Sequence, residues 1–413
     1  MPNIARLDDV KAALAASSRP PAVVVGLCTH GLAIVRGLVR RGVVVVAVES
    51  NWKQPSSRTR YGLKLHHPDL YGPSLLNLLH ELSRASKVKP VLFVTNDRMV
   101  RHLNRHQEAL RRDFHLPFPR AELLDELIEK DTMTPLAVRQ GLRIPRSWTV
   151  SGEAARDPSG AGMPAEIGFP CIVKPATPMS AIKVLLVPDR ESFTKAAAAH
   201  PEIDRFIVQE WIEGNDERVH FTAYYFDREG RVRGAFAGQK IRQVPRTLGN
   251  SSAARGVYRP DLVDEGLKLF AGLGYRGIAS VEFKLASDGT PYFIEATVGR
   301  SDYWMKTLPL NGVDLPALVY SDLTGVDLRA PERQRNRVAW VDGDRDLWVY
   351  LESWGDPACS KRRLLAQLLE PKRFALYDWR DPLPYLAWWG TLARRVGSIV
   401  ARRFGARVGP VPA

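Results

Sequence analysis

Residues 280–300 read SVEFKLASDGTPYFIEATVGR, which predicts two β-strands joined by a turn at Asp288-Gly289. Asp-Gly is a preferred two-residue hairpin turn, because a type I′ turn needs positive φ at both central positions. A hairpin centred on this pair places Glu282 directly opposite Glu295. A loop with an odd number of residues would instead put the two glutamates on different faces of the sheet.

The two faces of this hairpin differ in character. Side chains alternate between the faces of a sheet, so one face is predicted to be apolar, with Val281, Phe283, Leu285, Tyr292, Ile294 and Ala296. The other face holds Glu282, Lys284 and Glu295. Like charges directly opposite each other destabilise a sheet, whereas a divalent cation between them would be favourable. We expect a magnesium site here, and the alternative is a solvated face with two ordinary glutamates.

The composition is that of a globular protein with anionic partners. The chain has 413 residues, 45% of them hydrophobic and 25% charged, and a formal net charge of +14. That charge favours nucleotides, phosphorylated metabolites, an anionic membrane surface or nucleic acid. Cys28, Cys171 and Cys359 are too few for a disulfide framework or a thiolate cluster. No signal-like apolar segment is visible at the N-terminus, so we expect a cytoplasmic protein.

Residues 22–50 predict a strand, a glycine-containing turn, a helix and a second strand. Gly26 and Gly31 do not belong to a Walker A motif, because Leu32-Ala33 stands where Lys-Ser/Thr is required. A tight strand-to-helix turn explains them better than cofactor binding. A similar unit follows over residues 73–112. Ligands of open α/β sheets gather at the carboxyl ends of strands, so Cys28, His30 and Asp97 are candidates for lining a substrate mouth.

The middle of the chain carries several candidate ligand-binding residues. Lys174 ends an apolar strand just before Pro175, where it is well placed for a phosphate. Glu210 and Glu217 flank a Gly-Asn turn, and a buried carboxylate at Glu210 would need a donor partner. The segment 240–256 is basic, with Lys240, Arg242, Arg246 and Arg255. It either clamps anions or forms a solvated connection.

Taken together, the motifs resemble the ATP-grasp superfamily, in particular its carboxylate-amine ligase-like branch, and also the large chain of carbamoyl-phosphate synthase and biotin carboxylase. The resemblance rests on the order of Glu129-Lys130-Asp131, IVKP at 172–175, VQEWIEG at 208–214, VEFK at 281–284 and IEATVGR at 294–300. It implies an α/β (α+β ATP-grasp) fold. A Rossmann-like pre-ATP-grasp domain over 1–125 would precede a two-lobed ATP-grasp domain over 126–330, with a mobile lobe at about 145–212, and a Trp-rich, basic C-terminal region over 331–413.

The resemblance also implies roles for individual residues. Lys130 and Lys174 would reach the phosphates of ATP, and Lys183 follows the flexible loop. Gln209 and Glu210 would border the adenine, and Glu217 would bind the ribose. Lys240 and Arg242 resemble a basic pair that faces the triphosphate or the acyl phosphate. Glu282 and Glu295 match the two magnesium-binding acids, and Arg300 matches the arginine that stabilises developing charge.

Three positions depart from the family pattern. Thr297 stands where the family usually has Asn, and Gly299 moves Arg300 one residue further along the chain. The phosphate-covering loop at 175–183 contains no glycine. We interpret these changes as those of a subtype.

The implied reaction activates a substrate carboxylate with ATP as an acyl phosphate, which an amine then converts to an amide with release of ADP and phosphate. The cofactors would be ATP and Mg²⁺, with Mn²⁺ as an alternative metal, and the partners a small-molecule carboxylate and a small-molecule amine. Phosphoryl transfer of this kind needs mainly positioning and charge neutralisation. The alternative is a non-catalytic ATP-binding scaffold at a membrane surface.

The C-terminal segment is apolar and basic. The helix predicted there carries Trp388, Trp389 and Leu392 beside arginines, and residues 385–407 contain no acid. One interpretation is peripheral contact with an anionic membrane through residues 385–407, and the other is a terminal helix docked on the protein's own core. No recognisable platform for specific nucleic-acid binding is present. A homodimer is a further hypothesis about partners.

Overall fold

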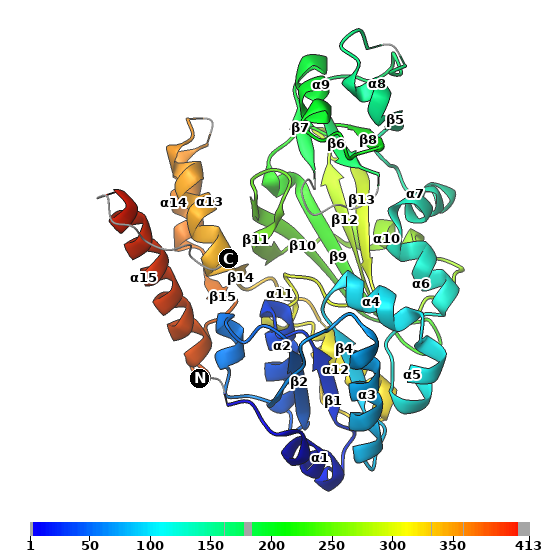
Figure 1. The fold of residues 1–413 in the computed structure, drawn as a ribbon, viewed down its shortest axis with the longest axis vertical. Coiled ribbons are helices and arrows are strands. Elements are labelled where there is room, and N and C mark those ends of the chain that lie inside the picture. The colour runs from blue at the N-terminus through cyan, green and yellow to red at the C-terminus, as the bar shows by residue number, and fades with distance from the viewer. Residues whose placement is uncertain (1–2, 161, 177–183, 332, 358, 404–413) are drawn as a thin grey trace.

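The described residues form three sheets with helices packed around them (Figure 1). The computed structural model describes residues 3–160, 162–176, 184–331, 333–357 and 359–403, without the side chains of 131, 344 and 395–403. In Figure 1 the N-terminal sheet lies at the bottom, the largest sheet in the middle and the third sheet at the top. The predicted α/β class is confirmed.

The N-terminal sheet is parallel and has the strand order β3-β2-β1-β4. Its strands are β1 (Ala22–Val25), β2 (Val45–Glu49), β3 (Leu63–His66) and β4 (Val91–Val94). The helices of this part are α1 (Leu7–Ala16), α2 (Thr29–Val39), η1 (Pro55–Arg58), α3 (Pro73–Ala85), α4 (Asp97–Asn104) and α5 (Gln107–Asp113). β1 and β2 are buried along their whole length, as expected for a parallel sheet covered on both faces.

The glycines after β1 serve the strand-to-helix turn. Gly26 has a φ of +93°, and a Cβ there would lie 2.0 Å from Oγ1 of Thr95. A Cβ on Gly31 would lie 2.1 Å from the carbonyl oxygen of Gly26. Gly26 therefore excludes a side chain because of its positive φ and the Thr95 side chain, and Gly31 excludes one because the backbone of Gly26 lies too close.

The upper sheet is antiparallel with the order β5-β8-β6-β7. Its strands are β5 (Ser147–Ser151), β6 (Cys171–Pro175), β7 (Leu185–Val187) and β8 (Arg205–Glu210). The helices before it and on it are α6 (Ala121–Ile128), α7 (Lys130–Arg139), α8 (Gly152–Arg156) and α9 (Arg190–Ala198). This sheet has its own small apolar core around Phe193 and Phe206.

The central sheet has seven strands in the order β13-β12-β9-β10-β11-β14-β15. They are β9 (Val219–Phe226), β10 (Val232–Val244), β11 (Asn250–Gly256), β12 (Gly277–Leu285), β13 (Pro291–Val298), β14 (Ala339–Val341) and β15 (Lys372–Phe374). The accompanying helices are η2 (Asp216–Arg218), α10 (Pro260–Lys268), α11 (Thr307–Leu310) and α12 (Leu315–Thr324).

In the β12–β13 hairpin Glu282 faces Glu295 as predicted, but the loop and the strand pairing differ from the prediction. The loop has three residues, 287–289, because the Ala286 amide donates to the Thr290 carbonyl. Only Gly289 has positive φ there, so the predicted type I′ turn is wrong. An odd loop alone would separate the glutamates, but a second irregularity between Glu282 and Phe283 restores the register, and Glu282 faces Glu295.

This compensation also corrects the predicted apolar face. Phe283 pairs with Phe293 and not with Ile294. Phe293 is therefore buried in the core, whereas Tyr292 and Ile294 are only partly buried and Ile294 lines a cavity. The sequence did not reveal the bulge, because Phe293 and Ile294 are both apolar and either could face the core.

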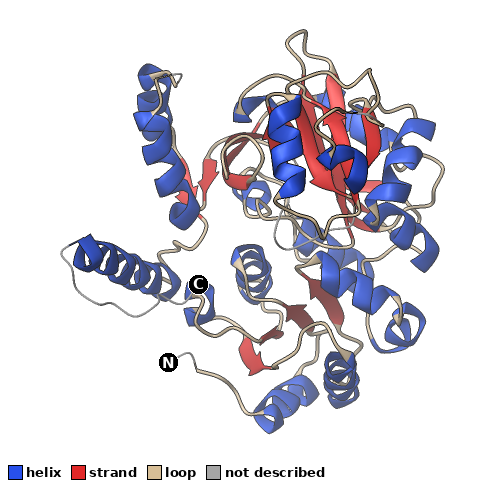
Figure 2. Ribbon diagram, turned by 45° about the horizontal axis from the view of Figure 1, so that its top comes forward, coloured by secondary structure: helices blue, strands red, loops and turns tan. Residues whose placement is uncertain are grey.

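The C-terminal region adds two strands to the central sheet and three helices beside it. β14 and β15 come from this region and extend the sheet beyond β11, so hydrogen bonds cross the boundary predicted at residue 330. The helices are α13 (Gly343–Gly355), α14 (Lys361–Leu369) and α15 (Leu383–Arg403). They stand on one side of the molecule in both views (Figures 1 and 2). The domain divisions at 125 and 330 remain predictions.

Helix α15 is docked on the protein over its first turns. Trp388 and Leu392 are buried in the core cluster that also contains strands of the N-terminal sheet. Leu386 and Trp389 of the same helix are exposed. Among the described residues, no helix combines the length and the hydropathy needed to cross a bilayer.

Candidate active site

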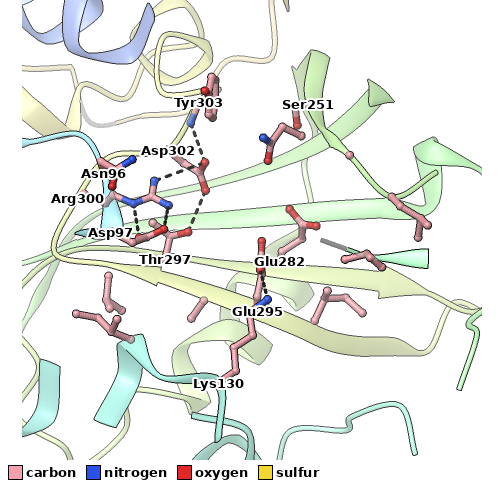
Figure 3. A pocket seen from close by; sticks show the side chains of 18 of the residues that line it. Asn96, Asp97, Lys130, Ser251, Glu282, Glu295, Thr297, Arg300, Asp302 and Tyr303 are labelled. Atoms are coloured by element: carbon pink, nitrogen blue, oxygen red, sulfur yellow. Dashed lines mark hydrogen bonds and ion pairs between the residues drawn. The ribbon is translucent and has the colours of Figure 1, made fainter. Parts of the chain in front are cut away.

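A cavity of about 890 Å³ lies where the three sheets come together. Its walls include Cys28, His30 and Asp97 after strands of the N-terminal sheet, which the sequence predicted to gather at one mouth. The predicted site residues that line it are Lys130, Lys174, Gln209, Glu210, Lys240, Glu282, Glu295 and Arg300. Side chains far apart in sequence thus face one space, part of which Figure 3 shows.

The two glutamates of the hairpin sit side by side on adjacent strands (Figure 3). Nζ of Lys240 lies 2.7 Å from Oε2 of Glu282, and Nζ of Lys130 lies 3.7 Å from Oε2 of Glu295. Burial raises the pKa of the Glu282 carboxyl, Lys240 opposes this shift, and the negative charge of Glu295 adds to it. The pair is therefore a site where additional positive charge would be favourable.

These donors fit a magnesium ion that shares its ligands with a phosphate. Mg²⁺ is usually held by one or two carboxylates together with substrate phosphates, and Glu282 and Glu295 supply two carboxylates from facing positions. Within the part of the chain that the structure describes, no group of three or more His, Cys, Asp or Glu residues could hold a metal by itself. An ion at this pair would therefore need oxygen ligands from a bound molecule or from water.

Several lysines converge on the same cavity. Lys174 donates a hydrogen bond of 3.4 Å to Oε1 of Gln209, and burial together with Lys130 lowers its pKa to about 8. Lys284 donates to the carbonyl oxygens of Gly214 and Asn215. Burial also lowers its pKa to about 8. Such depressed values mark lysines that a bound anion would stabilise in the charged form.

A second polar network lies beside the glutamates (Figure 3). Arg300 donates to both carboxylate oxygens of Asp97, at 2.5 Å from Nε and 2.9 Å from Nη2. Burial works to raise the pKa of Asp97, but the Arg300 charge outweighs it and lowers that pKa. Asp302 accepts a hydrogen bond of 3.2 Å from the hydroxyl of Thr297. A carboxylate thus lies next to the position where the family usually has Asn.

The opposite wall is formed by β8 and the residues that follow it. Gln209, Glu210, Trp211 and Ile212 all line the cavity. The carboxylate of Glu210 accepts from the backbone amide of Arg146 at 3.2 Å and forms an ion pair with its guanidinium at 3.3 Å. The donor partner that a carboxylate in this strand requires is therefore Arg146.

Arg242 does not line the cavity, contrary to the predicted basic pair. Its guanidinium donates to both oxygens of Asp346 in α13, at 2.7 and 2.6 Å. The pairing of β10 with β11 is irregular between Lys240 and Gln243. Regular alternation would put positions 240 and 242 on one face, but the irregularity puts Gln243 beside Lys240 instead, where it accepts from Nζ at 3.1 Å.

Glu217 also lies away from the cavity. Its side chain is 7% exposed. The carboxylate accepts a hydrogen bond of 2.8 Å from Nε2 of Gln367 and forms ion pairs with Arg255 and Arg363. The α14 partners are 146 and 150 residues further along the chain, so no local pattern could have revealed them. Lys183 lies outside the described residues.

Lys284 and Asp302 also line the cavity, and the sequence assigned a role to neither of them. Lys284 lies two residues after Glu282, so strand alternation places both on the same face of the sheet. That shared face was the signal in the sequence that could have pointed to Lys284. Asp302 lies just past the last motif and had no signal in the sequence. It reaches Thr297 because the chain turns back after Arg300.

Comparisons with known proteins bear on this site. No known family profile matches the chain. It is 23% identical over 266 residues to a D-aspartate ligase of Enterococcus faecium, covering 60% of this chain and 62% of that protein. It is 26% identical over 222 residues to a D-alanine–D-alanine ligase of Geobacillus thermodenitrificans, covering 48% and 57%. The chain thus spans about three fifths of the length of these curated relatives.

A solved structure shows the same fold. The biotin carboxylase of Campylobacter jejuni, in complex with β,γ-ATP, superposes with a TM-score of 0.59 at 16% identity, covering 77% of this chain and 74% of that one. Fold, motifs and relatives agree on one class of protein. The resemblance to ATP-grasp carboxylate-amine ligases that the motifs indicated is confirmed by these similarities. Both curated relatives are ligases, which does not favour the non-catalytic alternative.

Proposed function

We propose that this protein is an ATP-dependent ligase that activates a small-molecule carboxylate as an acyl phosphate and joins it to an amine. The observation that carries the proposal is the cavity in which the paired Glu282 and Glu295 meet Lys130, Lys174 and Arg300. Such an array supplies positive charge where a transferring phosphoryl group needs it. The names of the two curated ligases support the joining of a carboxylate to an amine.

The proposed roles follow the walls of the cavity. Lys130, Lys174 and Lys240 would hold phosphate oxygens, and Gln209 and Glu210 would border the base of the nucleotide. Glu282 and Glu295 would hold Mg²⁺, or Mn²⁺ as the alternative, and the bound metal would neutralise charge on the phosphates. Arg300 would stabilise the developing charge. Arg242 and Glu217 have no part in this proposal, because neither of them lines the cavity.

The test is a screen of carboxylic acids and amines for ADP release, with mass spectrometry of the product. We expect ADP formation that requires an acid, and a product larger than that acid once an amine is added. Binding of MgADP without ADP formation for any acid would support the scaffold instead. The first trials are D-aspartate and D-alanine, because the curated relatives are named for them.

The depressed pKa of Lys174 gives the proposal a pH signature. With a pKa of about 8, Lys174 is charged at pH 7 and loses its proton as the pH rises through 8. We therefore expect the Kd of a non-hydrolysable ATP analogue to be constant near pH 7 and to rise by up to about tenfold per unit above pH 8. Isothermal titration calorimetry between pH 7 and 9.5 measures it.

Lys174→Arg is the matched control for this titration. Arginine stays protonated throughout the range, so the rise in Kd should be much smaller in that variant. Part of the slope can persist, because Lys284 titrates in the same range. A slope unchanged by Lys174→Arg contradicts the assignment of Lys174 to the phosphates.

We further propose a cytoplasmic protein that contacts anionic membranes at their surface, with a homodimer as an untested arrangement. Most exposed large apolar side chains of the described residues lie on α13, α14 and α15 or between them, including Leu351, Leu368, Leu369, Trp379 and Leu386. Acids of this region pair with arginines of the rest of the protein, as Asp346 does with Arg242. Exposed Arg362, Arg373, Arg380 and Arg394 remain beside the apolar side chains, a combination suited to anionic lipid.

Replacing Leu368 and Leu369 by Asp tests the membrane contact. These residues are 53% and 86% exposed, so the double variant should fold, yet it removes the burial of two leucines in lipid. We expect co-sedimentation with phosphatidylserine vesicles to fall at least about tenfold. Tyr258→Asp, at an 81% exposed position outside this region, should bind like the wild type. If the double variant binds the vesicles as well as the wild type does, the membrane proposal is wrong.

A further inference from the structure

Cys28 and His30 line the cavity and have no part in the proposed ligation. Cys28 is the residue before α2 and lines the cavity, and His30 lies in the first turn of that helix. Sγ of Cys28 is 3.4 Å from Nδ1 and 3.3 Å from Nε2 of His30. The transfer of an acyl group through an acyl phosphate needs no protein nucleophile, so a thiol and an imidazole in contact here call for another explanation.

The surroundings of His30 fix which nitrogen can take a proton. Nε2 lies 2.9 Å from the carbonyl oxygen of Thr95, which can only accept, so Nε2 carries a hydrogen. Nδ1 is then the free acceptor beside the thiol. The imidazole is 2% exposed and lies against the ring of Tyr303, with the ring centroids 5.2 Å apart. Cys28 is thus placed as a nucleophile and His30 as its base, and the carbonyl of Thr95 orients the imidazole.

Electrostatics favours the thiolate at this position. Burial works to raise the pKa of Cys28, but the charge and hydrogen bond of His30 and the backbone N–H of Gly31 lower it below its usual value. The positive end of α2 acts in the same direction. Cys171 provides the contrast within the chain, since burial without such partners raises its pKa to about 11.

Cys28 and His30 share one space with Arg300 and its neighbours. Arg300, Thr297 and Asp302 line the same cavity as Cys28 and His30. Tyr303, which packs against the His30 ring, directly follows Asp302. Burial works to lower the pKa of His30 and the Arg300 charge adds to this, but the charge and hydrogen bond of Cys28 outweigh them and raise that pKa. An acyl phosphate formed beside Arg300 would therefore be formed in the cavity that the thiol faces.

We propose that Cys28, with His30 as its base, is a covalent acyl acceptor in this protein. The proposal rests on the ligase function above. The thiolate attacks the acyl carbon, the C–S bond forms, the C–O bond to phosphate breaks, and the leaving phosphate takes the proton from Nδ1 of His30. The amine then attacks the thioester, the C–N bond forms, the C–S bond breaks, and Nδ1 takes the amine proton. The thiolate and the imidazolium are restored.

Acetyl phosphate tests the proposal without knowledge of the natural acid. We expect the full-length protein, incubated with acetyl phosphate at neutral pH, to gain one acetyl group on Cys28, removable by hydroxylamine. Peptide mass spectrometry compares Cys28 with Cys359, which is also partly exposed and serves as an internal reference. Labelling of Cys28 should be at least tenfold faster, and equal labelling of the two cysteines overturns the proposal.

Variants separate this proposal from the proposed function. His30→Gln should slow labelling of Cys28 at least tenfold, whereas Cys359→Ser should leave it unchanged. If His30→Gln does not fold, the labelling rates of Cys28 and Cys359 in the wild-type protein still test whether Cys28 is the acyl acceptor. Acid-dependent ADP release that persists in Cys28→Ser while the amide product is lost supports the acyl acceptor. Undiminished amide formation in Cys28→Ser contradicts it and leaves the ligase function intact.

Discussion

Glu295→Gln is expected to abolish acid-dependent ADP release, with a loss of at least about 100-fold. Removing a group that only supports a metal ligand typically costs 10–100-fold, so loss of a ligand itself should exceed that range. Glutamine keeps the size of the side chain and the pairing with Glu282, so the fold should persist. A coupled assay for ADP, together with a titration of Mg²⁺, measures the effect.

The control for Glu295→Gln is the same change at an exposed position. Glu108 has a side chain that is 94% exposed on α5, and Glu108→Gln should release ADP at the wild-type rate. Full activity of Glu295→Gln would remove the magnesium assignment. A loss of ADP release that excess Mg²⁺ partly restores would strengthen it.

Asp381→Asn is expected to lower the free energy of unfolding by about 3–5 kcal/mol. Asp381 is fully buried and accepts from Nε of Arg36 and from the backbone amide of Arg60, both at 2.9 Å. The Arg36 side chain is only 4% exposed, so neutralising Asp381 leaves a buried guanidinium without its counter-charge. Urea unfolding followed by tryptophan fluorescence measures the difference.

The comparison variant is Asp261→Asn, whose side chain is 60% exposed and paired with Arg259. Exposed ion pairs contribute at most about 1 kcal/mol, so this variant should be nearly as stable as the wild type. Equal stability of Asp381→Asn and Asp261→Asn would mean that the Arg36–Asp381 pair does not hold the C-terminal region to the N-terminal sheet.

Much of the fold was predictable because it is encoded locally. The pattern of residues 22–50 predicts the strand, turn, helix and strand that the structure contains. The similar unit predicted over residues 73–112 contains α3, whose leucines are buried. The gathering of Cys28, His30 and Asp97 also followed, because the carboxyl ends of parallel strands share one edge of the sheet.

The errors occurred where a strand departs from regular pairing. The turn at 287–289 has one residue more than predicted, and a bulge before Glu295 compensates for it. In β10 the irregular pairing removes Arg242 from the cavity and brings in Gln243. A bulge adds a residue without changing the character of the side chains, so a sequence pattern does not reveal it.

By itself, the sequence determined the order of the motifs that resemble those of the ATP-grasp superfamily, because motif order is a property of the chain alone. The pairing of Glu282 with Glu295 was predicted from a two-residue turn, but in the structure it depends on a bulge that compensates for a longer loop. Only the tertiary structure decided which charged residues meet. Glu217 is bound by α14, Arg242 by α13, and Asp302 lies beside Thr297. Those partners are set by how distant elements pack against one another. The contact of Cys28 with His30 depends on both the sequence and the tertiary structure. The two residues are close in the sequence, but the imidazole is oriented by Thr95, which follows another strand.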